Sequence, residues 1–325
     1  MEQYMSPEKQ NSQEGWCTKR RTNSALTFSR RRLLQSSMET LEIAHHGSYT
    51  NNSGGIVDIH DSLDKAMKGT VHYHHTHTFP STRGGGFGRT EFRVVYSPSL
   101  EAAGALKGCL HIGVLNSASG KTPGGGFFKG TVSQEDCICR ASLLYPCIAQ
   151  FQLKRDHFYQ INNSDQYRFS SSSCALFSPR VPVIRKDNVE GKLLDAYYEC
   201  SFVSIPAANA FTAEKGANSS PAATPEPQDP DDSIDYESKR QVLENAMSDR
   251  IFRALSIFAE QGCTDLVLSA FGCGVHGNDP SMVADIFKEM ITKDFKGCFK
   301  TVVFAIQRSR PANYTAFSSV FEINQ

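Results

Sequence analysis

Two adjacent carboxylates, Glu135 and Asp136, stand at the predicted start of a helix with apolar periodicity in this chain. The preceding loop carries three consecutive glycines, Gly124–Gly126, and follows a predicted strand that ends at Asn116. Glycine gives up the most backbone entropy on ordering, so such a run makes sense where a ligand lies against bare main chain. The helix dipole stabilises acidic residues in a first turn, so a purely structural role for both remains open.

A second loop lies between another predicted strand and helix. It consists of Gly272, Cys273, Gly274, Val275, His276 and Gly277, and is followed by the suitable N-cap Asp279 and the suitable first helical residue Pro280. Its glycines let successive backbone N–H groups turn inward, which holds a phosphate near a helix start. A tight strand-to-helix turn is the other interpretation. The two loops together predict a phosphorylated sugar ligand, with acids at the sugar and amides at the phosphates.

The elements that position these loops follow from apolar patterning. Runs rich in β-branched and aromatic residues predict buried strands at Phe92–Tyr96, Leu110–Leu115, Ala175–Phe177, Tyr198–Ser204, Asp265–Ala270 and Thr301–Ile306. Helical periods predict helices at Gln134–Gln150, Tyr236–Glu260 and Pro280–Thr292. This alternation is typical of an α/β fold with helices on both faces of one sheet. We expect one domain over residues 24–325.

Three segments depart from this pattern. Residues 1–23 are polar and without period, so we expect a disordered tail before an amphipathic helix over Ser29–His46 that ends at Gly47. Residues 72–90 are rich in histidine and glycine and predict a loop. Residues 211–235 are rich in Ala, Ser, Pro and Asp and predict a disordered insertion. Such an insertion is tolerated because loop closure costs only about 0.6 kcal/mol per doubling of length.

Composition excludes several classes of protein. Lys plus Arg and Asp plus Glu number 34 each, so no global field would hold duplex DNA through its phosphates, and we expect no direct DNA binding. No stretch approaches the roughly 20 apolar residues of a membrane span. The ten cysteines are scattered through predicted strands and helices of a chain too long to need disulfides, so we expect reduced thiols. A soluble intracellular protein follows.

Two groups of potential metal ligands do not predict a metal site. Cys137 and Cys139 form a CxC pair inside a predicted helix, unlike the paired CxxC pattern of structural zinc sites. The histidines of His72–His77 alternate between opposite faces of an extended segment, and no acidic or thiol partners lie near them in the sequence. We therefore expect neither a metal nor a cofactor.

The spacing of the first loop resembles a known motif. Gly124–Gly126, then seven residues, then Gln134-Glu135-Asp136 closely resembles the GGG-x(6–8)-QEE motif of poly(ADP-ribose) glycohydrolases. Further blocks look like the microbial-type branch of that family, namely Arg32–Tyr49, Val57–Tyr73, Tyr96, Leu115–Tyr145, Phe177–Arg185, Ser204–Asn209 and Arg250–Ile306. The resemblance covers about residues 30–325, apart from the histidine- and glycine-rich loop and the proline-rich insertion.

This resemblance implies a macrodomain-like, three-layer α/β/α fold with a central mixed sheet and an N-terminal helical extension. It implies a hydrolase that cleaves the ribose–ribose O-glycosidic bond of poly(ADP-ribose) and releases ADP-ribose. Asp136 would be the catalytic acid, and Glu135 would hold ribose hydroxyls. The remaining ligand-binding residues would be Asn116, Gly124, Gly125, Gly126 and Gln134 around the distal ribose, and Gly272, Cys273, Gly274, Val275, His276 and Gly277 around the diphosphate.

Two positions depart from the family pattern. Asp136 replaces the family's Glu, which withdraws the carboxyl by roughly 1.5 Å, a shift that can cost on the order of a hundredfold in rate. His276 replaces a usual Phe. Two alternatives therefore stay open: a reader that binds ADP-ribose with weak or no catalysis, and a hydrolase for mono-ADP-ribosyl groups.

The expected partners are poly(ADP-ribose) or ADP-ribosylated protein, with ADP-ribose as product and no membrane. The resemblance also implies a role in ADP-ribosylation and the DNA damage response. The basic clusters Lys19–Arg21 and Arg30–Arg32 would serve as a nuclear import signal or as a solvated helix face, so a nuclear or a cytoplasmic location is expected.

Overall fold

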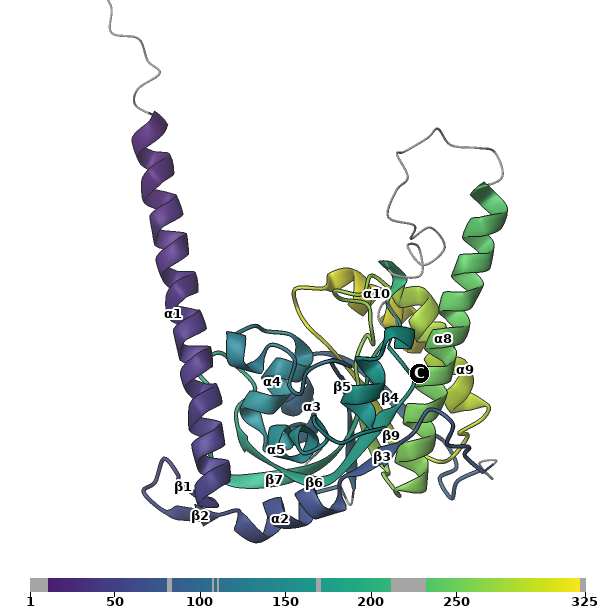
Figure 1. The fold of residues 1–325 in the computed structure, drawn as a ribbon, viewed down its shortest axis with the longest axis horizontal. Helices are drawn as coiled ribbons and strands as arrows, with labels where there is room; N and C mark the ends of the chain where they lie inside the picture. Colours follow the sequence, from purple (N-terminus) through teal and green to yellow (C-terminus); the bar gives the residue numbers. More distant parts are fainter. Residues whose placement is uncertain are drawn as a thin grey trace, which may run out of the picture.

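A seven-stranded mixed sheet forms the centre of the molecule, with strand order β3-β6-β7-β5-β8-β9-β4 (Figure 1). The computed structural model describes residues 11–80, 84–106, 108–109, 111–167, 171–211 and 232–321. The strands of this sheet are β3 (Val71–Tyr73), β4 (Glu91–Tyr96), β5 (Ile112–Ser117), β6 (Ala175–Arg185), β7 (Leu193–Ile205), β8 (Asp265–Leu268) and β9 (Thr301–Ile306). All six predicted strands are therefore confirmed, with shifted ends. A separate hairpin joins β1 (Ser48–Thr50) and β2 (Ile56–Asp58).

The direction of the strands divides the sheet into two parts. From β7 through β5, β8 and β9 to β4, every neighbouring pair is parallel. β6 runs antiparallel to β7 and to the edge strand β3. A register shift between Ser178 and Val181 accompanies Arg180, whose φ of 44° is unusual for a residue with a side chain.

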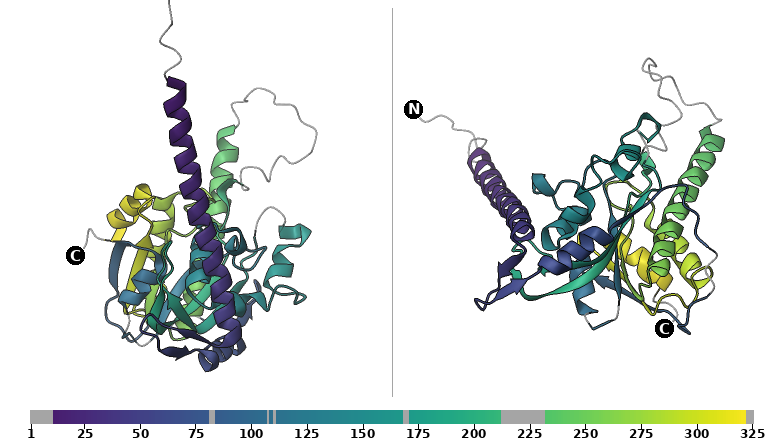
Figure 2. Two further views of the ribbon diagram at one scale, coloured as in Figure 1. Left: turned by 90° about the vertical axis from the view of Figure 1, so that its left-hand side faces the viewer. Right: turned by 60° about the horizontal axis from the view of Figure 1, so that its bottom comes forward.

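Helices cover both faces of the sheet, as Figures 1 and 2 show. They are α1 (Asn11–His46), α2 (His60–Gly69), α3 (Ser99–Ala105), α4 (Gln134–Ala141), α5 (Leu144–Ala149), α6 (Phe158–Asn162), α8 (Asp232–Glu260), α9 (Pro280–Thr292) and α10 (Pro311–Phe321), with short 3-10 turns η2 (Phe127–Lys129) and η3 (Asp165–Tyr167). Successive side chains of a strand enter opposite cores: Val114 packs in the core with α2 to α5, and Leu115 packs in the core with α8 to α10. The predicted three-layer α/β/α fold with a central mixed sheet is confirmed.

The predicted helix Gln134–Gln150 is wrong in one respect, because it is two helices. Ser142 is extended, with φ of −133° and ψ of 171°, and forms a β-bridge with Val183. Leu143 then donates its N–H to the carbonyl of Pro182. Pairing with β6 therefore replaces one turn of helix and separates α4 from α5.

The N-terminal segment is more helical than predicted. Residues 11–23 belong to α1, so the prediction of disorder is wrong from Asn11 onward, while residues 1–10 lie outside the described part. A helix already held at its C-terminal half adds one hydrogen bond for each further residue, so it extends into this polar segment. The predicted end is confirmed, since Gly47 has a φ of 72° and donates to the carbonyl of Ile43.

Two other predicted loops need correction. His72 and Tyr73 belong to β3, which pairs with β6, so the loop predicted at residue 72 begins after Tyr73. The helix predicted from Tyr236 begins at Asp232, and most of the predicted insertion, residues 212–231, lies outside the described residues. None of the helices in the described part of the chain combines the length and apolar run that a bilayer crossing needs.

The neighbouring parallel strands β5 and β8 position the two glycine loops. After β5 the chain leads to α4 in one core, whereas after β8 it leads to α9 in the other core. Loops that leave adjacent strand ends toward opposite faces open a crevice between them. The side chains of α1 brace one wall of this crevice, because Ser37 Oγ donates to the Phe127 carbonyl and Thr40 Oγ1 donates to the Arg140 carbonyl.

Candidate active site

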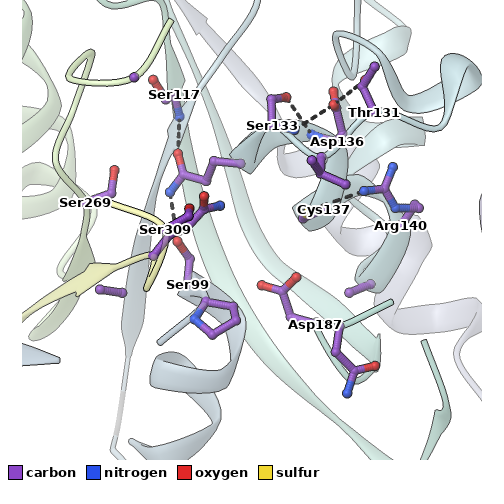
Figure 3. A pocket seen from close by; sticks show the side chains of 18 of the residues that line it. Ser99, Ser117, Thr131, Ser133, Asp136, Cys137, Arg140, Asp187, Ser269 and Ser309 are labelled. Carbon is purple, nitrogen blue, oxygen red and sulfur yellow. Dashed lines mark hydrogen bonds between the residues drawn. The ribbon is translucent and has the colours of Figure 1, made fainter. Parts of the chain in front are cut away.

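A cavity of about 830 Å³ lies at the C-terminal ends of β5, β8 and β9. Figure 3 shows one wall, which carries Thr131, Ser133 and Asp136, opposite Ser117 and Ser269 at the strand ends. The first glycine loop (residues 120–133) and the second glycine loop (residues 272–277) both contribute to its lining. The structure thus brings the two loops to one cavity.

Asp136 is fixed at the start of α4 by a capping box. Ser133 is the N-cap: its hydroxyl accepts from the Asp136 N–H, and its own N–H donates to Asp136 Oδ2 at 2.9 Å. Thr131 Oγ1 donates to the same oxygen at 2.5 Å, and the Gly126 N–H donates to Oδ1 at 2.7 Å. Three donors therefore hold a side chain that is 1% exposed.

The glycines of the first loop are required by this close packing. A β-carbon on Gly126 would overlap the Thr131 hydroxyl. Gly125 has a φ of 55°, and a β-carbon there would lie 3.0 Å from oxygens of both Glu135 and Asp136. The two carboxyl groups therefore face one small volume, which only bare main chain leaves open.

Glu135 lies behind the first loop and is 2% exposed. Its Oε2 accepts from the Ser119 N–H at 2.7 Å, whereas its buried Oε1 has no donor among the described residues. Burial raises the pKa of Glu135 to about 8; the charge of Asp136 adds to this rise, and the hydrogen bond from Ser119 opposes it. At neutral pH this side chain carries a proton.

The side chains of Gln134 and Asn116 connect the site to neighbouring elements by hydrogen bonds. Gln134 Oε1 accepts from the Ser117 N–H, and its Nε2 donates to Ser99 Oγ and to the Leu115 carbonyl. Asn116 donates to Ser204 Oγ on β7, and its buried Oδ1 has no donor among the described residues. Gln134 lines the cavity, whereas Asn116 lies in the sheet beneath it.

The second loop is held from behind. Asn278, 4% exposed, donates from Nδ2 to the carbonyls of Ala208 and Gly272 at 2.8 and 2.9 Å. The predicted cap of α9 is confirmed, since Asp279 Oδ1 accepts from the Ser281 N–H and Pro280 opens the helix. These contacts turn Gly274, Val275 and His276 toward the cavity, and Val275 is 79% exposed.

Two side chains of the second loop have pKa values that are shifted by burial. Burial lowers the pKa of His276 from its ordinary value, and the positive charge of Arg250 lowers it further. Burial raises the pKa of Cys273 to about 12, so its thiol stays protonated. Neither residue brings a charge to the loop at neutral pH.

The sequence did not single out the far wall of the cavity. It is formed by Arg140 on α4 and by Arg185 and Asp187 at the β6–β7 turn. Arg140 Nη2 donates to Cys137 Sγ, while burial raises the pKa of Asp187 to about 6. Arg185 Nε donates to Thr40 Oγ1 on α1. These residues come from separate elements without a local motif, so only the fold brings them together.

The predicted site residues divide into two groups. Those that line the cavity are Gly126, Gln134, Asp136, Gly272, Gly274, Val275 and His276. Those that are absent from its lining are Asn116, Gly124, Gly125, Glu135, Cys273 and Gly277. Thr131, Ser133, Ser119 and Asn278 hold the site and were missed, although the Ser133-x-x-Asp136 spacing is a capping-box signature that sequence reasoning can find.

Both the sequence and the fold of the chain are similar to those of known proteins. Residues 37–186 match the family model described as the catalytic domain of microbial-type PARG, poly(ADP-ribose) glycohydrolase. The structure of PARG from Thermomonospora curvata has 28% identity and a TM-score of 0.74, covering 89% of this chain and 99% of that chain. PARG from Deinococcus radiodurans in complex with ADP-ribose has 29% identity and a TM-score of 0.67, covering 81% and 98%.

A third similar structure is the Thermomonospora curvata enzyme bound to the inhibitor ADP-HPD, with 28% identity, a TM-score of 0.69, and coverage of 88% of this chain and 98% of that chain. Comparison with curated proteins gives no match. The family resemblance predicted from the sequence is confirmed: residues 37–186 match the microbial-type PARG catalytic domain, and the fold is similar to that of bacterial PARG structures.

Proposed function

We propose that this protein is a glycosidase that hydrolyses the ribose–ribose O-glycosidic bond of poly(ADP-ribose) and releases ADP-ribose. One observation carries the proposal: Glu135 and Asp136 face one small volume beside the glycine run, and burial keeps a proton on Glu135 at neutral pH. A proton retained in a pair of carboxyls is what general acid catalysis of glycoside cleavage needs.

The ligand would lie across both loops. The distal ribose would lie at Gly126 and Asp136, and the diphosphate would lie on the main chain of Gly274 and His276 at the start of α9, where the helix dipole favours negative charge. The similar structures of PARG with ADP-ribose support this class of ligand. The second glycine loop supports it as well, because its neutral side chains leave main-chain groups as the means of recognition.

The reaction follows from the acid pair. A carboxyl proton moves to the leaving ribose oxygen, and the bond from that oxygen to the anomeric carbon breaks as the sugar becomes oxocarbenium-like. Water adds to the anomeric carbon, and the proton that water loses restores the carboxyl group. The ionised member of the pair stabilises the positive charge that develops between these steps.

The two carboxyls would share one proton. In the free protein burial keeps it on Glu135, while both oxygens of Asp136 accept hydrogen bonds from neighbouring groups of the first loop. Asp136 is the member that lines the cavity, so we assign it the delivery of the proton to the leaving oxygen. Glu135 would hold ribose hydroxyls and keep the proton available to the pair.

The proposal is tested by incubating poly(ADP-ribose) with the wild type, Glu135→Gln and Asp136→Asn, and measuring released ADP-ribose by chromatography. Asp285→Asn, an exposed carboxyl on α9, serves as the matched control. We expect release by the wild type and the control and its loss in the two site variants. Absence of release from polymer by the wild type would refute the proposal, and release from mono-ADP-ribosylated protein alone would identify a mono-ADP-ribosyl hydrolase instead.

One observation favours a second function, binding of ADP-ribose without cleavage. Asp136 is already engaged by Gly126, Thr131 and Ser133, as a purely structural capping residue would be. Calorimetry with ADP-ribose beside the release assay separates the two. Tight binding without release by the wild type, with release gained in Asp136→Glu, would identify a reader whose shorter acid had ended catalysis.

A further inference from the structure

Three basic residues form an exposed surface where α1 passes the first glycine loop. Arg30 and Arg31 are exposed on α1, and Lys129 is exposed at the end of η2. We name this group the basic rim. Arg30 Nε donates to the Lys129 carbonyl at 2.9 Å, which joins the two segments.

The basic rim adjoins the wall of the cavity that carries the acid pair. A β-carbon on Gly130 would lie 3.0 Å from Arg30 Cγ, so α1 packs directly against this turn. The next residue, Thr131, lines the cavity and donates to Asp136. Leu33, one helical turn after Arg30, also lines the cavity. A chain leaving the cavity past Asp136 on this side would meet the basic rim.

Two acidic residues that contact Arg32, the neighbour of the basic rim, are paired with other cations. Glu39 pairs with the buried Arg185 at 3.1 Å and with Arg32 at 3.4 Å. The side chain of Glu190 pairs with Lys192, and its carbonyl accepts from Arg32. The formal net charge of the whole protein is zero. The positive charge at the basic rim is therefore a local feature and not part of a general cationic surface.

A second group of basic residues lies earlier in the sequence. Lys19, Arg20 and Arg21 precede Arg30, Arg31 and Arg32 by 11 residues each. Figures 1 and 2 show α1 running alongside α4 and projecting beyond the sheet.

We propose that the basic rim binds phosphates of the substrate polymer beyond the bond that is cleaved. This inference rests on the proposed function, because it assumes that the cavity holds one unit of poly(ADP-ribose). Each further unit of such a polymer carries a diphosphate, so the part outside the cavity is a linear polyanion. Lys and Arg side chains recognise such a chain by releasing its counterions, without contacts to its bases.

The test measures binding, so that cleavage does not interfere. Polymer of defined length and ADP-ribose are titrated into Asp136→Asn protein and into the same protein with Arg31→Gln and Lys129→Gln, across 50 to 200 mM salt. This pair of substitutions leaves the Arg30–Lys129 backbone contact in place. The matched control is Lys296→Gln with Lys300→Gln, two exposed lysines beside the N-terminal end of β9, opposite the cavity.

Loss of two phosphate contacts should reduce the slope of log affinity against log salt by about 1.4, since each contact contributes about 0.7 on a single strand. The parent protein should thus lose about sevenfold more polymer affinity than the basic-rim variant over this fourfold change in salt. The affinity for ADP-ribose should be equal in the parent, the variant and the control.

An equal salt slope in the variant and its parent would overturn the inference. The inference would also be overturned if a single-stranded oligonucleotide with the same number of phosphates bound as tightly as the polymer and lost as much affinity in the variant. The basic rim would then be a nucleic-acid site. Failure of the parent to bind ADP-ribose at all would instead count against the proposed function itself.

Discussion

Each of the two glycine loops lies between a parallel strand and a helix, yet the two loops use their main-chain groups differently. In and beside the first loop, the N–H groups of Ser119, Gly126 and Ser133 donate to the protein's own carboxyl groups. In the second loop, Asn278 binds carbonyls from behind, and Gly274 to His276 face the cavity. One loop is built around an internal anion, whereas the other is left for an external one.

This difference explains why similar glycine content leads to different roles. A carboxylate held by main-chain donors is placed accurately but is costly to disturb, because each lost partner leaves a buried polar group unsatisfied. A loop fixed only through its carbonyls keeps its shape while its outer face exchanges water for ligand. The following predictions test this contrast, from the largest expected effect to the smallest.

Removing either acid should have the largest effect. Glu135→Gln and Asp136→Asn are each expected to lower kcat by about 10² to 10⁴, the range that general acid catalysis contributes. ADP-ribose affinity should change far less, because the diphosphate is assigned to the other loop. Rate and calorimetric measurements on the same preparations check this. Equal losses in rate and in affinity would show that the first loop binds the ligand and does not catalyse.

Glycine substitutions should have the next largest effect, and they should affect the two loops differently. Gly126→Ala would overlap the Thr131 hydroxyl and break its bond to Asp136, so we expect about a hundredfold loss of rate and about 1–3 kcal/mol of stability. Gly274→Ala meets nothing within 4 Å, so its free energy of unfolding should stay within about 0.5 kcal/mol of the wild type. Denaturant unfolding checks both variants, and equal destabilisation would remove the contrast.

The buried proton of the first loop should appear in the pH dependence of stability. The pKa of Glu135 is about 8 in the folded protein and near 4.5 when unfolded, so the folded state binds the extra proton between these values. The contribution of this proton to the free energy of unfolding is complete below pH 4.5. It decreases by up to about 1.4 kcal/mol per pH unit until pH 8. Glu135→Gln should remove this slope from denaturant unfolding curves. An unchanged slope would show that Glu135 is ionised in the folded protein.

The smallest effect is expected in the second loop. Because burial lowers the pKa of His276, its imidazole is neutral at pH 7, and His276→Phe should alter ADP-ribose affinity less than about threefold at pH 7 and leave its pH dependence between 7 and 8 unchanged. Calorimetry at three pH values checks this. A large loss above pH 7 would show that the imidazole itself binds the diphosphate and that recognition is not by main chain alone.

The strands and the cap of α9 could be predicted because local patterning determines them. Runs of β-branched residues buried on both faces predicted β5, β8 and β9. Asp279 before Pro280 predicted the start of α9. The full length of β6 could not be predicted, since Pro179 and Pro182 disfavour a strand, and pairing with the distant β7 sustains β6 beyond Phe177.

The site was predictable in part for the same reason. Glu135, Asp136 and the glycine run share one local motif, and their presence beside one cavity followed from it. Which carboxyl retains a proton depends on burial and on donors such as Ser119 and Thr131, which the chain brings in only after folding. The far wall at Arg140 and Asp187 joins α4 to a hairpin, a contact without a sequence signature.

The strand order also decides how much of the chain must be present before any of it can fold. Within residues 37–186, β5 has neither of its neighbours, because it pairs with β7 and β8, and β4 pairs only with β9. The segment that carries the acid pair is therefore not an independently folding piece. During synthesis β5 must wait for β7 and β8, and β4 must wait until Thr301–Ile306 has emerged, so early chain termination before β9 should leave β4 unpaired and the product prone to aggregation.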